Sequence, residues 1–152
     1  HTPTRRQRQM CIRDSRINEG LFNMKEHKHL IVRAEVNNPP MSEEEAKKSI
    51  VELIDMIDMK LLMGPFAKYV EVEGNRGLTV ASIIETSHVV LHSWDEQTPA
   101  VVQLDVYTCS CLEPSVVFDW LQRYNPIKIQ HKFIDREFDL TILDRTQEVL
   151  SN

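Results

Sequence analysis

Hydrophobic and polar residues follow two different periods along this chain, and each change of period marks a new element. From His29 the segment HLIVRAEV is rich in β-branched residues and stops at the breaker Asn-Asn-Pro-Pro, which predicts a strand. Ser42 followed by Glu45 predicts a capping box at the start of a helix. Gly64–Pro65 is expected to end that helix. Its apolar residues recur at the spacing of one helix face: Ala46, Ile50, Leu53, Ile54, Ile57 and Leu61.

The rest of the chain is typical of strands joined by turns, with one more helix. Strands are expected at 66–73, 78–84, 87–94, 100–109 and 127–134, a tight turn at 74–77, and an amphipathic helix at 113–124. An interruption near Glu85–Thr86 separates two of the strands. The order β-α-β-β-β-α-β predicts an α+β protein. We expect a two-layer αβ sandwich: one mainly antiparallel sheet of about six strands, with two amphipathic helices on one face.

Composition and charge divide the chain into a short basic head and an acidic body. The 152 residues are 41% hydrophobic, which suits a single domain. Residues 1–16 hold five Arg and one Asp, a net charge of +4 against −5 for the whole chain, so the other 136 residues carry −9. An acidic body argues against a nucleic-acid partner. Residues 1–16 resemble a translated sequencing adapter, so we expect a non-native, disordered leader, a true start near Met24, and one domain over 24–145.

Two further features bear on the compartment. No apolar run reaches the length of a membrane-spanning helix and no signal-peptide pattern is found, so we expect a cytoplasmic protein without a membrane partner. The three cysteines, Cys11, Cys109 and Cys111, are expected to remain thiols in a reducing compartment.

The segment IIETSHVVLHSWDE, residues 83–96, combines a strand pattern with reactive side chains. A buried polar side chain costs free energy unless it has a partner, so the cluster is either a satisfied network or a site. His88 and His92 could bind zinc together with Cys109 and Cys111 if the segment were helical. Its β-branched residues favour a strand, on which His88, His92 and Trp94 share a face. We therefore expect no metal here, although the alternation does not exclude a zinc site.

The same segment also resembles a known family. TSHVVLHSWDE followed by DVYTC is similar to the self-processing segment of the small prokaryotic S-adenosylmethionine decarboxylases, whose pattern is roughly Glu-Ser-His, three residues, His-Thr-Trp-Pro-Glu, then Asp-Val-Phe-Thr-Cys. The similarity is strong from Gly77 to Cys109 and weaker from about His29 to Leu121. The resemblance implies a two-layer αβ sandwich that acts as a homodimer of cleaved protomers.

The resemblance implies that the chain cleaves itself between Thr86 and Ser87. The Ser87 hydroxyl would attack the Thr86 carbonyl, an N-to-O acyl shift would give an ester, and β-elimination would break the chain. The new N-terminus would carry a covalently bound pyruvoyl group derived from Ser87, which can form a Schiff base with a substrate amine and accept electrons as carbon dioxide leaves. The product of S-adenosylmethionine would be the aminopropyl donor for spermidine synthesis.

Three further residues take catalytic roles by position in the family pattern. His92 matches the histidine that moves protons during processing, and Thr79 matches the hydroxyl residue that stabilises the intermediate. Cys109 matches the thiol that returns a proton to the substrate carbon. Ser87 and His92 differ by an odd number, so on an unbroken strand they lie on opposite faces. We expect a bulge or turn at Glu85–Thr86, or a movement after cleavage, to resolve this.

The substrate-binding residues are expected to be Glu96, Trp94 and His88. A carboxylate such as Glu96 can accept two hydrogen bonds from a substrate, and the Trp94 ring can stack on an adenine or a cation, although a core position for Trp94 is an equal alternative.

Four departures from the family pattern concern the substrate more than the chemistry. Thr86 replaces Glu, Asp95 replaces Pro, Glu73 replaces an aromatic residue, and the stretch 96–109 is two residues longer. A pyruvoyl-dependent arginine or ornithine decarboxylase on the same scaffold is therefore an alternative. A homologue that is not processed and serves as a binding or regulatory subunit is another.

Overall fold

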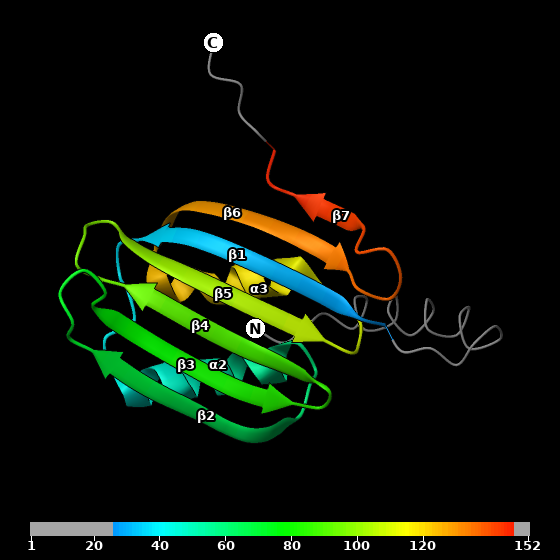
Figure 1. The fold of residues 1–152 in the computed structure, drawn as a ribbon, viewed down its shortest axis with the longest axis horizontal. Helices are drawn as coiled ribbons and strands as arrows, with labels where there is room; N and C mark the ends of the chain where they lie inside the picture. The colour runs from blue at the N-terminus through cyan, green and yellow to red at the C-terminus, as the bar shows by residue number, and fades with distance from the viewer. Residues whose placement is uncertain (1–25, 148–152) are drawn as a thin grey trace, which may run out of the picture.

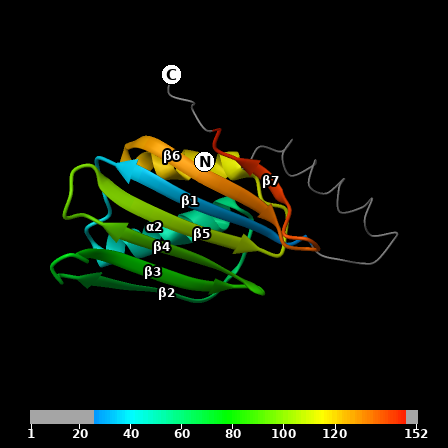
Figure 2. The ribbon, with the colours of Figure 1, turned by 45° about the horizontal axis from the view of Figure 1, so that its top comes forward.

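The computed structural model describes residues 26–147, which form one antiparallel sheet covered by two helices. The strands lie in the order β2-β3-β4-β5-β1-β6-β7, and every neighbouring pair is antiparallel. Figures 1 and 2 show both helices behind the same face of the sheet, while the opposite face has no helix over it among the described residues. The predicted αβ sandwich is confirmed. The proposed leader, 1–16, and the proposed start at Met24 lie outside the described residues.

The strands are β1 Lys28–Val36, β2 Leu61–Val70, β3 Gly77–Ile84, β4 Ser87–Trp94, β5 Ala100–Thr108, β6 Pro126–Asp135 and β7 Ile142–Arg145; the helices are α2 Glu43–Met56 and α3 Pro114–Leu121, the latter followed by the 3-10 turn η1 Gln122–Tyr124. The core lies between the helices and the sheet, where β1, β3, β4 and β5 each bury alternate residues. The described helices are all too short to cross a membrane.

The two helices begin where the sequence predicts. The Ser42 side chain accepts a hydrogen bond from the backbone N–H of Glu45 at 3.3 Å, and three acids follow in the first turn of α2, where the helix dipole favours negative charge. Pro114 starts α3, because proline lacks the N–H that the first turn leaves unpaired anyway. The fully buried Trp120 of α3 donates its indole N–H to the carbonyl of Ser49 at 2.7 Å, which joins the two helices.

The predicted end of the first helix is wrong. Helix α2 ends at Met56, and Asp58 has a left-handed φ of 60°, which an α-helix cannot continue through. Leu61 already belongs to β2, and Gly64–Pro65 lies inside that strand, where the pairing with β3 shifts register. The register shifts at the start of β2 remove the alternation of polar and apolar residues, so periodicity did not predict a strand there.

The predicted number of strands is one too low. β7 pairs with β6 at the edge of the sheet, and all four of its residues are exposed. A strand that buries neither face has no alternation of polar and apolar residues, so the pattern predicted a polar tail there.

The hairpin of β3 and β4 positions most of the predicted site. Ile84 pairs with Ser87 and Thr79 pairs with His92, and the intervening turn places Thr86 at a φ of 47°. At the other end of the hairpin, a Cβ on Gly77 would lie 1.8 Å from the carbonyl oxygen of Ser93, so only glycine fits.

Candidate active site

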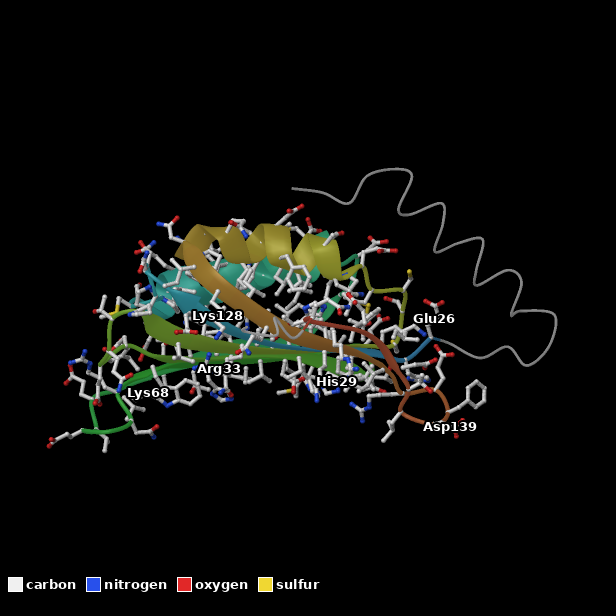
Figure 3. All side chains as sticks on the ribbon, turned by 90° about the horizontal axis from the view of Figure 1, so that it is seen from above. Glu26, His29, Arg33, Lys68, Lys128 and Asp139 are labelled. Atoms are coloured by element: carbon white, nitrogen blue, oxygen red, sulfur yellow. The ribbon has the colours of Figure 1, made fainter. Side chains whose placement is uncertain are left out.

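Strand β4 presents two chemically different faces. Ser87, Val89, Leu91 and Ser93 are buried beneath the helices, whereas the alternate residues of the strand are half-buried on the opposite face, which we call the open face. Figure 3 views the sheet edge-on, with the helices on one side and His29 and Arg33 of β1 on the other, open, side. The pleat alone produces this division, because successive side chains of a strand point to opposite faces. The predicted nucleophile and the predicted proton carrier are therefore separated by the sheet.

Ser87 is the first residue of β4, and its hydroxyl lies in the core. The residue is 8% exposed, and its Oγ is the one buried side-chain oxygen or nitrogen within 26–147 that has no hydrogen-bond partner. Burying a hydroxyl without a partner costs about 1–3 kcal/mol, so such groups are rare in folded proteins. This serine follows directly on Thr86, whose left-handed backbone is itself uncommon for a β-branched residue.

Cys109 lies next to the same turn. It directly follows β5 and is 8% exposed, and its Sγ donates a hydrogen bond to the carbonyl of Glu85 at 3.1 Å. The structure thus brings together Thr86, Ser87 and Cys109, three residues that the sequence selected. Cys111, in contrast, is disulfide-bonded, so the prediction that all three cysteines remain thiols is wrong.

Thr79 and His92 form a second group, on the open face. The Thr79 hydroxyl and the Nδ1 atom of His92 are 2.9 Å apart, because the two residues are direct partners in the β3–β4 ladder. His92 lies five residues from Ser87, which corresponds to about 17 Å along an extended strand. The expected turn at Glu85–Thr86 exists, but it precedes Ser87 and leaves β4 unbroken. Within one uncleaved chain, the two groups therefore do not meet.

Trp94 and Glu96 lie beside an open pocket of about 370 Å³ at the far end of β4. The indole N–H of Trp94 donates to the Asn75 side chain at 2.9 Å, so this tryptophan is not a core residue. Glu96 Oε1 accepts the backbone N–H of Arg76 at 2.9 Å. Two guanidinium groups, those of Arg33 and Arg76, also line the pocket.

Asp95 explains how Arg76 is held. Its carboxylate is 1% exposed and accepts hydrogen bonds of 2.6 Å from both Arg76 Nε and the Tyr69 hydroxyl. The hydrogen bond to Asp95, followed by burial and by the negative charge of Asp95, raises the pKa of Tyr69 above its ordinary value. Sequence reasoning marked Asp95 only as a departure from the family pattern and missed the roles of Tyr69 and Arg76.

His88 belongs to a third group. Asp105 Oδ1 accepts hydrogen bonds from Nε2 of His88 at 2.8 Å and from Nε2 of His29 at 2.7 Å. Burial works to raise the pKa of Asp105, but the hydrogen bonds and positive potential of both imidazoles outweigh it and hold that pKa below its usual value. The sequence-based zinc site is not assembled. His92 pairs with Thr79, Cys109 lies at the buried turn, and Cys111 is disulfide-bonded.

The fold and these groups define a class: an αβ sandwich with a serine buried at the start of a strand and a threonine and histidine paired on the opposite face. A family model for S-adenosylmethionine decarboxylase matches residues 28–137. The chain therefore belongs to the S-adenosylmethionine decarboxylase family.

Individual relatives agree with this assignment. The chain is 41% identical over 64 residues to an S-adenosylmethionine decarboxylase proenzyme of Pyrobaculum islandicum, and 39% identical over 64 residues to that of Pyrobaculum arsenaticum. Each match covers 41% of this chain and 50% of the relative, so the chain spans about half the length of the curated relatives it matches. The adenosylmethionine decarboxylase of Aquifex aeolicus has a similar structure, with a TM-score of 0.56, 17% identity, and coverage of 82% of this chain and 99% of that one; at this identity the likeness concerns the fold alone.

Proposed function

We propose that this chain is a self-processing S-adenosylmethionine decarboxylase that makes its own pyruvoyl group by cleaving the Thr86–Ser87 bond. One observation carries the proposal: the Ser87 hydroxyl is buried without a partner, directly after a turn residue with a left-handed backbone. An unpartnered hydroxyl costs stability, and such strained, unsatisfied positions gather at functional sites. A serine that only packed in the core would be expected to bond a nearby carbonyl, as Ser82 bonds that of Val89 at 2.8 Å.

The processing step uses the backbone as its reagent. Ser87 Oγ attacks the Thr86 carbonyl carbon, and the C–N bond of the peptide breaks as the acyl group moves to oxygen. A base then removes the Ser87 α-proton, and the ester leaves as the carboxylate of Thr86. Water replaces the nitrogen of the resulting dehydroalanine and releases ammonia, which leaves a pyruvoyl group on the new N-terminus. No external oxidant or reductant is needed.

The residues around Ser87 suit that group. When present, the pyruvoyl group supplies an electron-accepting carbonyl for the loss of carbon dioxide from a bound amino acid. Cys109, whose thiol already lies at the turn, would return the proton to the substrate carbon. Trp94 and Glu96 line a pocket at the opposite end of β4 from Ser87, so they would bind a substrate that reacts at the Ser87 of a second copy.

The distance between the two catalytic groups supports a homodimer of cleaved protomers. Thr79 and His92 lie on the face opposite the Ser87 side chain and about five strand residues away, so they cannot reach the Ser87–Thr86 bond of their own chain. The open face also exposes apolar side chains, including Ile31 at 43% and Ile83 at 48%. A second copy packed against this face in the opposite direction would bring its own Thr79 and His92 to the end of the first copy's β3–β4 hairpin. Thr86 is exposed there, so the partner's residues could approach the Thr86–Ser87 bond from its Thr86 side.

Co-expression of two defective chains tests the shared site. A His92→Ala chain retains Ser87, and a Ser87→Ala chain retains His92. If the partner supplies His92, the His92→Ala chain is cleaved when the Ser87→Ala chain is present and much less when it is alone. Cleavage that depends only on the chain's own His92 would exclude the shared arrangement.

Carbon dioxide release from S-adenosylmethionine, ornithine and arginine, measured in parallel, tests the substrate. Ornithine, arginine and S-adenosylmethionine all carry a second cationic group, so the two guanidinium groups of the pocket do not separate these substrates. The flat Trp94 ring beside the pocket favours S-adenosylmethionine, because of the three only this substrate carries an adenine that can stack on it. We expect release from S-adenosylmethionine, the precursor of the aminopropyl donor for spermidine. Release from ornithine or arginine instead would overturn the substrate assignment, and an uncleaved chain inactive on all three would favour a binding or regulatory subunit.

A further inference from the structure

Three side chains that commonly bind metals meet on the open face, and the proposed processing uses neither His29 nor Asp105. They come from three strands: His29 from β1, His88 from β4 and Asp105 from β5. Both imidazole Nε2 atoms lie within 2.8 Å of the same carboxylate oxygen, and one ligand atom from each residue can be chosen so that all lie within 4.8 Å of one another.

The sheet itself holds these three residues together. β5 lies between β1 and β4, and its Tyr107 pairs with His29 on one side and with His88 on the other. Asp105 lies two residues from Tyr107 on the same face, which places it diagonally opposite both histidines. The positions are therefore set by continuous backbone ladders rather than by loops, as a preorganised binding site requires.

The chemistry of the three groups selects the kind of ion. Two imidazole nitrogens and one carboxylate oxygen are ligands that Zn²⁺ and related transition metals accept at about 2.0–2.2 Å, whereas Mg²⁺ and Ca²⁺ prefer oxygen ligands. Ligand atoms around such an ion are about 3.4 Å apart in tetrahedral geometry. The two contacts to Asp105 would lengthen slightly toward this value, and no ligand atom starts more than 4.8 Å from another. Three protein ligands also leave a coordination position open.

We propose that His29, His88 and Asp105 form a binding site for a divalent transition-metal ion such as Zn²⁺. His88 follows Ser87 in the chain, but its side chain lies on the opposite face of the sheet, so the existence of the site does not depend on the proposed self-cleavage.

Arg136 is the feature that tunes this site. Its NH1 atom lies 3.5 Å from Nδ1 of His29, and its guanidinium carbon stacks 3.9 Å from the centre of the Tyr107 ring. When Nε2 of His29 binds a metal, the ring proton moves to Nδ1 and faces the Arg136 cation, which is unfavourable. Replacing Arg136 should therefore strengthen metal binding.

Equilibrium dialysis against Zn²⁺ and titration with Co²⁺, whose visible spectrum reports its ligands, test the proposal on the full chain. We expect one tight site per chain. Asp105→Asn and His29→Gln should each weaken it at least about tenfold, since even changes outside the ligand set cost about 10–100-fold. Arg136→Ala should strengthen it severalfold. The matched control is the pair His131 and Asp144, whose side-chain atoms are 3.0 Å apart but which has no third ligand among the described residues; His131→Gln should leave the tight site unchanged.

Running the same titrations on a Ser87→Ala chain separates this proposal from the proposed function. Binding should be the same whether or not the chain can cleave itself. Absence of stoichiometric zinc, or binding that Asp105→Asn and His29→Gln leave unchanged in variants with native circular dichroism, would overturn the proposed site.

Discussion

The two faces of β4 differ in what they do with polar groups. Beneath the helices, Ser87 keeps a hydroxyl buried without a partner, while Val89 and Leu91 beside it form the core. On the open face His88 and His92 each have a hydrogen-bond partner, supplied by a neighbouring strand. The comparison teaches that the proposed nucleophile and the proposed proton carrier lie on separate faces of one strand, so the proposed cleavage requires an event that brings them together.

Replacing the nucleophile should have the largest effect. Ser87→Ala removes the only atom that can start the acyl shift, so we expect no cleavage and no decarboxylation. Denaturing electrophoresis of the purified protein and carbon dioxide release measure both. Ser82→Ala is the matched control, because Ser82 is also buried but its hydroxyl is hydrogen-bonded; the variant should lose about 1 kcal/mol of stability and still be cleaved.

Replacing the proton carrier on the other face should slow processing without abolishing it. His92→Ala is expected to reduce the rate of cleavage about 10²–10⁴-fold, the usual contribution of one general acid or base. Thr79→Ala, which removes its partner at 2.9 Å, should have a smaller effect in the same direction. The time course of cleavage after synthesis checks both. A His92→Ala chain processed at the normal rate would show that the open-face pair has no part in cleavage.

Truncating neighbouring valines compares the two faces directly as packing surfaces. Val89 is fully buried, whereas Val90 is half-buried on the open face. Val89→Ala should reduce the free energy of unfolding by about 2 kcal/mol, and Val90→Ala by less than about 1 kcal/mol. Urea unfolding in a Ser87→Ala background, in which the chain stays intact, provides the measurement. Equal losses would mean that a second copy covers the open face at Val90 as completely as the helices cover the core at Val89.

The smallest effect concerns the buried Asp95. The hydrogen bond to Asp95 raises the pKa of Tyr69, so the folded protein holds that phenol proton to a higher pH than the unfolded chain. The associated stability is present below the ordinary tyrosine pKa and is lost as the pH rises through the raised value. Asp95→Asn should lower the pKa of Tyr69 and flatten the alkaline loss of stability. Absorbance titration of the phenolate measures this, with Tyr69→Phe identifying the signal.

Periodicity predicted the parts of the fold whose burial is one-sided. β3, β4, β5 and α3 bury alternate or helically spaced residues, and their positions agree with the expectation to within a few residues. β7 could not be predicted, because all of its residues are exposed, nor could the start of β2, because its register shifts remove the alternation.

For the candidate site too, contacts between residues close in the sequence were easier to predict than contacts between distant strands. The resemblance to the family pattern selected both Thr79 and His92, and their pairing follows from one short hairpin. The contact of His29 with Asp105 joins residues 76 positions apart. It depends on which strands are neighbours and in what register, and nothing local in the sequence specifies either. Asp95 lies within the segment 83–96 that resembles the family. Its partner Tyr69 lies on β2, for which the sequence predicted only the second half correctly.

The central claim is that the chain cleaves itself at Thr86–Ser87 through the serine hydroxyl, and the masses of the purified, denatured protein test it most directly. We predict two fragments, residues 1–86 and 87–152, whose summed mass exceeds that of the intact chain only by the difference between one water and one ammonia. A single intact chain would contradict the claim, and so would fragments whose sum exceeds the intact mass by a whole water, since that is the product of ordinary hydrolysis.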